Sequence, residues 1–126
     1  MLLNLTDISN EPLQSQISRQ IRAKILAGEL KAGTSLPSIR LLARDQHVSV
    51  ITVQRAYEAL MREELIHSRR GKGFFVSEIA QKEKKELAKQ RLRENLELPV
   101  KAAMAEGLSS KEIHESVDFV IKEKIK

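Results

Sequence analysis

Apolar residues recur at helical spacing near the start of the chain. After Pro12, leucine and isoleucine occupy every fourth position from Leu13 to Ile25, and Gly28 ends the pattern. Proline is favoured in the first turn of a helix, and glycine is favoured just past its end. The pattern therefore predicts an amphipathic helix of about four turns.

Two shorter helices are predicted next, after a loop over 29–37 that is indicated by its glycine and proline residues. Ser38 and Ser49 each precede an apolar group, and serine is a preferred helix cap because its hydroxyl accepts a first-turn N–H. The second helix is expected to end near His47 and the third near Glu63. Four apolar residues form a single face of the third helix: Val53, Ala56, Tyr57 and Leu60.

Two short β-prone runs follow, Leu65–His67 and Phe74–Val76. Glycine tolerates the backbone conformations of tight turns, so the segment between the runs predicts a β-hairpin with a basic tip. The tip combines three cations with two glycines: Arg69, Arg70, Gly71, Lys72 and Gly73.

The rest of the chain predicts a helical tail. From Ile79 the sequence is rich in Glu, Lys, Ala and Leu, which indicates a long helix that is kinked or broken near Pro99. Gly107 then supplies a helix stop, and Ser109 and Glu112 have the spacing of a capping box before a final helix. We therefore expect two domains, over residues 1–78 and 79–126.

Composition narrows the class of protein. The chain has 126 residues, 41% of them hydrophobic, which is enough for one compact domain with a short appendage. Cysteine is absent, which excludes a disulfide framework, a zinc finger and a thiol nucleophile. The N-terminus lacks the basic start and apolar run of a signal peptide, so a cytoplasmic protein is expected. The net charge is +5, which permits an anionic partner without identifying one.

The sequence contains little evidence for a metal site or for a catalytic site. His47, His67 and His114 are scattered, and Asp118 alone lies at helical spacing from a histidine, which makes at most half a metal site. The common phosphate-loop, serine-hydrolase and zinc-protease motifs do not occur. We expect no catalytic residue, no metal and no cofactor.

The order helix, short helix, tight turn, helix and basic hairpin is that of a winged helix-turn-helix, a mainly α (α+β) fold that binds double-stranded DNA. The major groove is about 12 Å wide and admits one helix, so the third helix can reach base edges. Gln54 can pair with adenine, Arg55 with guanine or phosphate, and the methyl groups of Val50 or Thr52 with thymine. Ser49 and Thr52 could instead serve only as caps. Arg40 could span to the DNA backbone, and the hairpin cations could neutralise phosphates.

These residues resemble the DNA-binding domain of the GntR family. The resemblance covers about residues 10–77 and includes Gly28–Gly33 (GELKAG), Leu36–Ala43 (LPSIRLLA) and Arg70–Val76 (RGKGFFV) in the order found in the family. It places family DNA-contacting positions on Arg40, the start of the third helix and the glycines of the hairpin tip. Relatives carry Asn or Arg where this chain has Val50 and Ile51, which leaves the operator sequence open but not the binding.

The tail is similar to that of the YtrA subfamily, in which two helices mediate dimerisation. The resemblance implies a homodimer that binds a palindromic operator, most simply as a repressor. The apolar stripes of the tail also exceed what two helices can bury alone, so they should meet a second copy. The residues expected at that interface are Leu87, Leu92, Leu96, Ile113, Val117, Val120 and Ile121.

A protein-interaction module is the alternative function, since a winged helix can also pack on a protein. Salt would discriminate between them, because DNA affinity falls steeply with salt and apolar docking responds weakly. Only 48 residues follow Glu78, too few for an effector-binding domain, so any signal must act through the dimer interface or the first helix.

Overall fold

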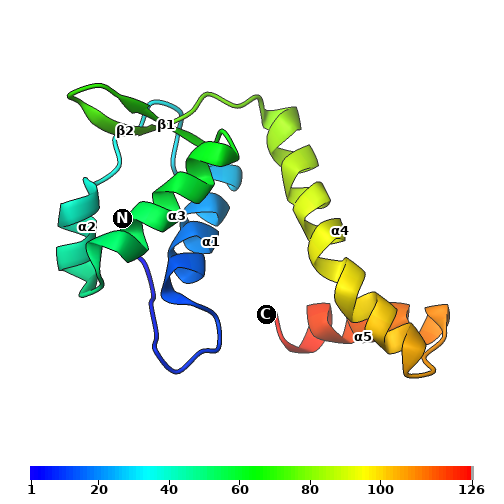
Figure 1. The fold of residues 1–126 in the computed structure, drawn as a ribbon. Helices are drawn as coiled ribbons and strands as arrows, with labels where there is room; N and C mark the ends of the chain where they lie inside the picture. Colours follow the sequence, from blue (N-terminus) through cyan, green and yellow to red (C-terminus); the bar gives the residue numbers. More distant parts are fainter. Residues whose placement is uncertain (126) are drawn as a thin grey trace. The chain divides into compact units, whose positions relative to one another are not determined.

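The computed structural model describes residues 1–125, and the described part confirms a mainly helical fold with a small hairpin (Figure 1). Its elements, in chain order, are α1 (Leu13–Leu26), α2 (Ile39–Gln46), α3 (Val50–Arg62), β1 (Ile66–Arg69), β2 (Gly73–Val76), α4 (Gln81–Ala105) and α5 (Ser110–Glu123). Internal contacts divide the chain into two compact units between Lys85 and Glu86, inside α4. The expected functional boundary at residue 78 stays a prediction. Within residues 1–125, no helix has the length and apolarity needed to cross a membrane.

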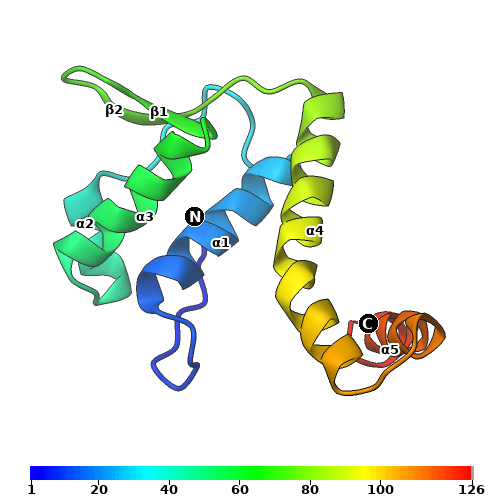
Figure 2. The same cartoon turned by 45° about the vertical axis from the view of Figure 1, so that its right-hand side comes forward.

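The core of the first unit lies where α1 packs on α3, side by side in both views (Figures 1 and 2). The predicted stripe of α1 is fully buried at Ile17, Ile21 and Ile25. The predicted face of α3 meets it and is equally buried, with no residue more than 1% exposed. Leu42 and Ala43 of α2 close the core on another side. The helical periodicity in the sequence therefore marks the residues that hold this unit together.

A partly buried ion pair joins α1 to Glu63, the residue that follows α3. Arg22 donates from Nε to one Glu63 carboxylate oxygen at 2.8 Å and from Nη2 to the other at 2.7 Å. The Arg22 side chain is only 9% exposed. Such two-pronged pairing fixes geometry, because both N–H groups of the planar guanidinium are aligned with one carboxylate. The contact joins α1 to the chain between α3 and the hairpin.

The hairpin is antiparallel, with Ile66 opposite Val76 and Arg69 opposite Gly73. The expected bounds of its strands were wrong by a few residues: Leu65 lies before β1, whereas Arg69 and Gly73 belong to the strands, which leaves a turn over residues 70–72. The loop predicted over 29–37 is present, and the structure adds a pairing that the sequence did not predict. Part of the loop runs along β2, where Leu36 donates its N–H to the Phe74 carbonyl at 2.9 Å and the Thr34 carbonyl accepts from Val76 at 2.9 Å. The strand β2 is therefore paired on both edges.

Residues 3–6 pack along α1 as an arm that the sequence did not predict. The Gln20 side-chain amide exchanges two hydrogen bonds with the backbone of Asn4, at 2.8 and 2.7 Å. Gln16 does the same with Thr6, at 3.0 and 2.9 Å. Gln16 and Gln20 are one helical turn apart and therefore lie on the same face. Each amide bonds both the N–H and the carbonyl of one arm residue, as a neighbouring strand would. Leu3 of the arm is buried.

The second unit contains α4 from Glu86 onward and all of α5. The sequence predicts a helix that is kinked or broken near Pro99, and the break is wrong, because α4 continues through Pro99 to Ala105. Proline leaves the carbonyl four residues earlier without a donor, and here both Pro99 and Asn95 are exposed, so water can satisfy that carbonyl. The predicted capping box before α5 is present: Ser109 Oγ accepts from Glu112 N at 3.2 Å, and Glu112 accepts from Ser109 N at 2.9 Å.

Candidate nucleic-acid interface

Two serine caps and a left-handed residue set the angle between α2 and α3. Ser38 Oγ accepts from Leu41 N at 3.1 Å at the start of α2, and Ser49 Oγ accepts from Thr52 N at 3.0 Å at the start of α3. Between the helices, His47 takes φ of 57°, a conformation that reverses the chain within three residues. The result is the helix-turn-helix that the sequence predicted.

A tyrosine holds α3 against the segment before α2. The Tyr57 hydroxyl donates to the Pro37 carbonyl at 2.7 Å, and its ring meets the Phe74 ring edge-on at 5.0 Å. Burial raises the pKa of Tyr57, so the phenol stays neutral and remains a donor. One side chain thereby connects α2, α3 and the hairpin, the three elements that carry the candidate contact residues.

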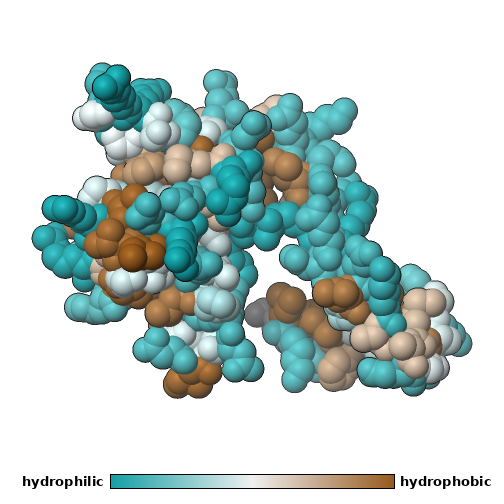
Figure 3. All heavy atoms as spheres, viewed as in Figure 1, coloured by the Kyte–Doolittle hydropathy of each residue, from teal (hydrophilic) through white to brown (hydrophobic). Residues whose placement is uncertain are grey.

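The start of α3 presents apolar and polar side chains to solvent together. Val50 is 46% exposed and Ile51 is 58% exposed, and Leu41 of α2 is 38% exposed. Figure 3 shows hydrophobic atoms gathered over α2 and the start of α3. Gln54, one turn further along α3, is exposed and donates to Glu58 at 3.2 Å. Exposed methyl groups beside an amide match the chemistry of thymine and adenine in the major groove.

Ser49 and Thr52 lie at the capped start of α3 and also on the candidate DNA-contacting surface. Their hydroxyl oxygens are 2.7 Å apart, and the capping role is present for Ser49, whose Oγ accepts from Thr52 N. Ser49 is exposed and Thr52 is half-buried. A hydroxyl that caps a helix can still accept or donate a second hydrogen bond, so capping does not remove either residue from the candidate surface.

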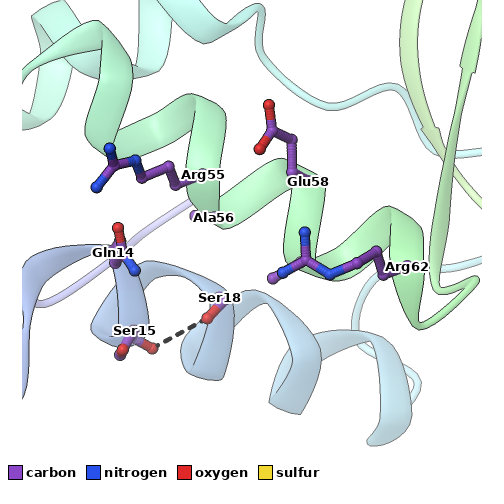
Figure 4. Close-up of a pocket in the computed structure, with 8 residues that line it drawn as sticks. Gln14, Ser15, Ser18, Arg55, Ala56, Glu58 and Arg62 are labelled. Atoms are coloured by element: carbon purple, nitrogen blue, oxygen red, sulfur yellow. Dashed lines mark hydrogen bonds between the residues drawn. The ribbon is translucent and has the colours of Figure 1, made fainter.

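Arg55 departs from the other candidates on α3. Figure 4 shows its guanidinium extending toward Gln14 of α1, at a cleft between the two helices. The residue lies on the edge between the exposed face of α3 and this cleft. The cleft could not be predicted from the sequence, because its lining is polar and comes from two helices that are far apart in the chain. Its residues Gln14 and Arg62 were not among the candidates.

The β1–β2 hairpin, called the wing below, carries five candidate contact residues at positions 69–73. Arg69 is anchored, since its guanidinium carbon lies 4.6 Å from the centre of the Phe75 ring on the adjacent strand. Arg70 and Lys72 lie in the turn and are exposed. Gly71 and Gly73 have φ of 73° and 97°, conformations that glycine adopts without strain. The turn is closed by a hydrogen bond of 2.9 Å from Lys72 N to the Arg69 carbonyl.

Arg40 lies in the first turn of α2 and is exposed. Among residues 1–125 it makes no ion pair, so its charge is available to a partner. The structure thus presents Arg40, the start of α3 and the wing as exposed groups on one compact unit.

The expected dimerisation residues lie on a unit with little internal burial. No residue from Glu86 to Ile125 is buried. Leu87, Leu96 and Ile113 are half-buried, whereas Leu92 is 59% exposed and Ile121 is 57% exposed; Val117 and Val120 are also exposed. A mostly apolar groove of about 450 Å³ runs between α4 and α5 and includes Leu96, Val100, Met104, Ile113 and Val117.

His114 and Asp118 also line this groove. His114 Nδ1 lies 2.7 Å from the Ser110 carbonyl, a bond within the helix. Within the described part of the chain, no three His, Asp or Glu side chains are grouped so that they could hold a metal ion.

Known proteins resemble this chain over part or all of its length. Residues 13–76 match the family described as bacterial regulatory proteins, gntR family. The HTH-type transcriptional repressor YtrA of Bacillus subtilis is 32% identical over 114 residues, which cover 90% of this chain and 88% of YtrA. The probable rhizopine catabolism regulatory protein MocR of Rhizobium meliloti is 41% identical over 78 residues, or 62% of this chain, but the chain spans only 16% of MocR.

Solved structures of other proteins also resemble this chain. The structure of a transcriptional antiterminator from Listeria monocytogenes superimposes with a TM-score of 0.74 at 29% identity and covers 100% of this chain and 94% of its own. The DNA-binding domain of AraR, in complex with the operator ORX1, gives a TM-score of 0.52 at 26% identity and covers 60% of this chain and 93% of its own.

Proposed function

The chain belongs to the GntR family of bacterial regulatory proteins, and on that premise we propose that it binds a palindromic operator as a homodimer and represses transcription. Regulators of this family are DNA-binding proteins rather than enzymes. The observation that carries the proposal is the capped α3 helix, whose start is exposed beside a basic wing. The proposed site of action is the cytoplasm, where a bacterial chromosome lies.

Base reading is assigned to α3. Gln54 offers an amide to the N6 and N7 edge of adenine, and Val50 and Thr52 offer methyl groups to thymine. Ser49 and Arg55 complete the set at the start of the helix. To read a base, the Gln54 amide has to leave Glu58, which is an exposed contact of low cost.

Phosphate binding is assigned to Arg40 and the wing. Arg69, Arg70 and Lys72 supply three charges, and Gly71 and Gly73 let the backbone come close to the groove because they have no side chain. These contacts hold the protein on DNA of any sequence and orient α3 within it.

Dimerisation is assigned to the second unit. A unit without one buried residue cannot hold its helices together by its own core, and its apolar stripes remain largely exposed. A second copy of the same unit offers an equal apolar surface. The proposed interface is formed by Leu87, Leu92, Leu96, Ile113, Val117, Val120 and Ile121. Two winged domains would then address half-sites about 34 Å apart, one turn of DNA.

The sign of regulation is proposed from the name of one relative: YtrA of B. subtilis is described as a repressor. A dimer bound at a promoter also obstructs polymerase. A reporter fused to the target promoter should rise in expression when the gene for this protein is deleted. A fall would reverse the sign and identify an activator.

The test of DNA binding is selection of bound duplexes from a random library at near-physiological salt, followed by sequencing. Enrichment of a two-fold palindrome is the expected result. A variant with Gln54→Ala, selected in parallel, should enrich a motif that is degenerate at one position of each half-site. An enriched motif without symmetry would contradict the homodimer, and absence of any motif would contradict sequence-specific binding.

A further inference from the structure

We propose that the cleft between α1 and α3 binds a phosphate group, and that its occupation is coupled to DNA binding through Arg55. The coupling rests on the proposed function, whereas the phosphate site itself does not. The phosphate can come from a phosphate ester free in solution or from the backbone of DNA next to the operator. Both sources present the same chemistry to the cleft.

The cleft is small and polar. Its volume is about 250 Å³, which suits a compact ligand such as an inorganic phosphate or a sugar phosphate. The α1 helix contributes Gln14, Ser15 and Ser18, and α3 contributes Arg55 and Arg62. Figure 4 shows the Arg55 guanidinium extending toward Gln14 and the Arg62 guanidinium extending back along α3 toward Ser18. The lining thus offers two cations, an amide and two hydroxyls.

The one carboxylate at the cleft is turned away from it. Glu58 accepts a hydrogen bond from Gln54 at 3.2 Å, and Figure 4 shows its carboxylate pointing away from α1. Repulsion between this carboxylate and a bound anion is therefore reduced by its orientation. The charged groups that face the gap between α3 and α1 are then the guanidinium groups of Arg55 and Arg62.

The two arginines of the cleft have unused hydrogen-bonding capacity. The arginines of α1 are paired, Arg19 with Glu11 at 3.0 Å and Arg22 with Glu63 at 2.7 Å. Arg55 and Arg62, by contrast, make no ion pair or hydrogen bond with a side chain of residues 1–125. They are seven residues apart on one helix, about 10.5 Å along its axis, so their long side chains can converge on one ligand. A guanidinium binds phosphate through parallel N–H groups.

Arg55 makes the cleft relevant to DNA. It lies on the edge that the cleft shares with the exposed face of α3, where the proposed base-reading residues are. A free phosphate ester in the cleft would hold the Arg55 guanidinium against α1 and away from DNA. By reciprocity, DNA that engages Arg55 would then weaken the binding of the ester by the same factor. A backbone phosphate in the cleft would instead add one contact to the complex.

The experiment compares the full-length wild type with Arg62→Gln and with Arg93→Gln, a control that removes the same charge from exposed α4. Calorimetric titration with inorganic phosphate, against chloride at equal ionic strength, measures the site directly. Anisotropy of a labelled duplex measures DNA affinity with and without phosphate. Because Arg62 is an exposed residue without an ion pair, its replacement should leave the fold intact, which thermal unfolding checks.

Two outcomes support the proposal and identify the source. With a free ester, phosphate binds the wild type and lowers its DNA affinity more than chloride does, and Arg62→Gln weakens phosphate binding by about tenfold. With a backbone phosphate, Arg62→Gln lowers DNA affinity and reduces the slope of log affinity against log salt by about 0.9, relative to Arg93→Gln.

If Arg62→Gln changed neither phosphate binding nor DNA affinity and its salt slope, the proposal would be overturned. If the wild type bound no DNA at all, the proposed function would fail, while the titration would still decide whether the cleft takes phosphate.

Discussion

The two units of this chain contain similar helical stripes but differ in what covers them. In the first unit the stripes of α1 and α3 bury one another, and every buried residue of the described chain lies in this unit. In the second, the stripes of α4 and α5 stay exposed or half-buried. An apolar stripe therefore predicts that a surface is covered, but it does not predict which partner covers it. The first unit is complete in one copy, and the second is the unit that we expect to need another.

The largest effect is expected from the core of the first unit. Ile21 is fully buried, so Ile21→Ala should lower the free energy of unfolding by about 2–5 kcal/mol through lost burial and the cavity left behind. Urea denaturation followed by circular dichroism measures this. Ile8→Ala is the matched control, because Ile8 is 94% exposed and its loss should cost less than about 0.5 kcal/mol. Equal costs for both variants would refute the assigned core.

The second largest effect concerns the surface of the second unit. Ile121→Asp should weaken self-association by about 100-fold, because it would place a carboxylate inside an apolar interface. Sedimentation equilibrium over a range of protein concentrations measures it. Unfolding of the first unit should be unchanged.

Lys122→Asp, which introduces the same group at the next residue, on the polar side of α5, serves as the control. If both variants associated as the wild type does, the stripe of α5 would not be the interface.

Within the first unit, α3 and the wing should affect DNA binding in different ways. Gln54→Ala should relax the preference at one base pair by about 1–3 kcal/mol. Arg70→Ala should weaken binding to all sequences and reduce the salt slope by about 1. Anisotropy titrations on the selected operator and on scrambled duplexes, at several salt concentrations, separate the two. Indistinguishable sequence profiles would show that our division of roles is incorrect.

The smallest effect is expected at the cap of α5. Ser109→Ala removes the hydroxyl that accepts from Glu112 N and should cost about 1 kcal/mol of helix stability. Hydrogen bonds from the Ser109 backbone and hydroxyl lower the pKa of Glu112. Because the pKa is lower in the folded helix, this stabilisation is full at neutral pH and is lost as the pH falls through the folded value.

Circular dichroism between neutral and acid pH should therefore show a loss of helix at low pH. This loss should be smaller in Glu112→Gln than in the wild type. An identical acid response in that variant would exclude the capping box as its cause.

The sequence predicted the elements whose signals are local. Ile17, Ile21 and Ile25 mark α1 because one helical turn separates them, and Ser38 and Ser49 mark helix starts because their hydroxyls reach N–H groups three residues away. The capping box before α5 is local in the same sense. These features need no knowledge of the rest of the fold.

Contacts between distant residues could not be predicted in this way. The pairing of segment 33–36 with β2 joins residues about 40 positions apart, and nothing in the composition of the segment indicates it. The alternative of a break at Pro99 relied on a rule that holds better for buried helices than for exposed ones. The cleft beside Arg55 joins α1 and α3, so no single stretch of sequence indicates it.

The match to the family begins at residue 13, whereas the folded unit begins earlier. Asn4 and Thr6 lie outside the match and pair with Gln20 and Gln16, respectively, inside it. A domain cut at the family boundary would leave both glutamine amides without their backbone partners and would uncover part of α1. In evolution, the two glutamines and the arm should therefore be kept or lost together, so relatives that lack the arm should carry other residues at these two positions.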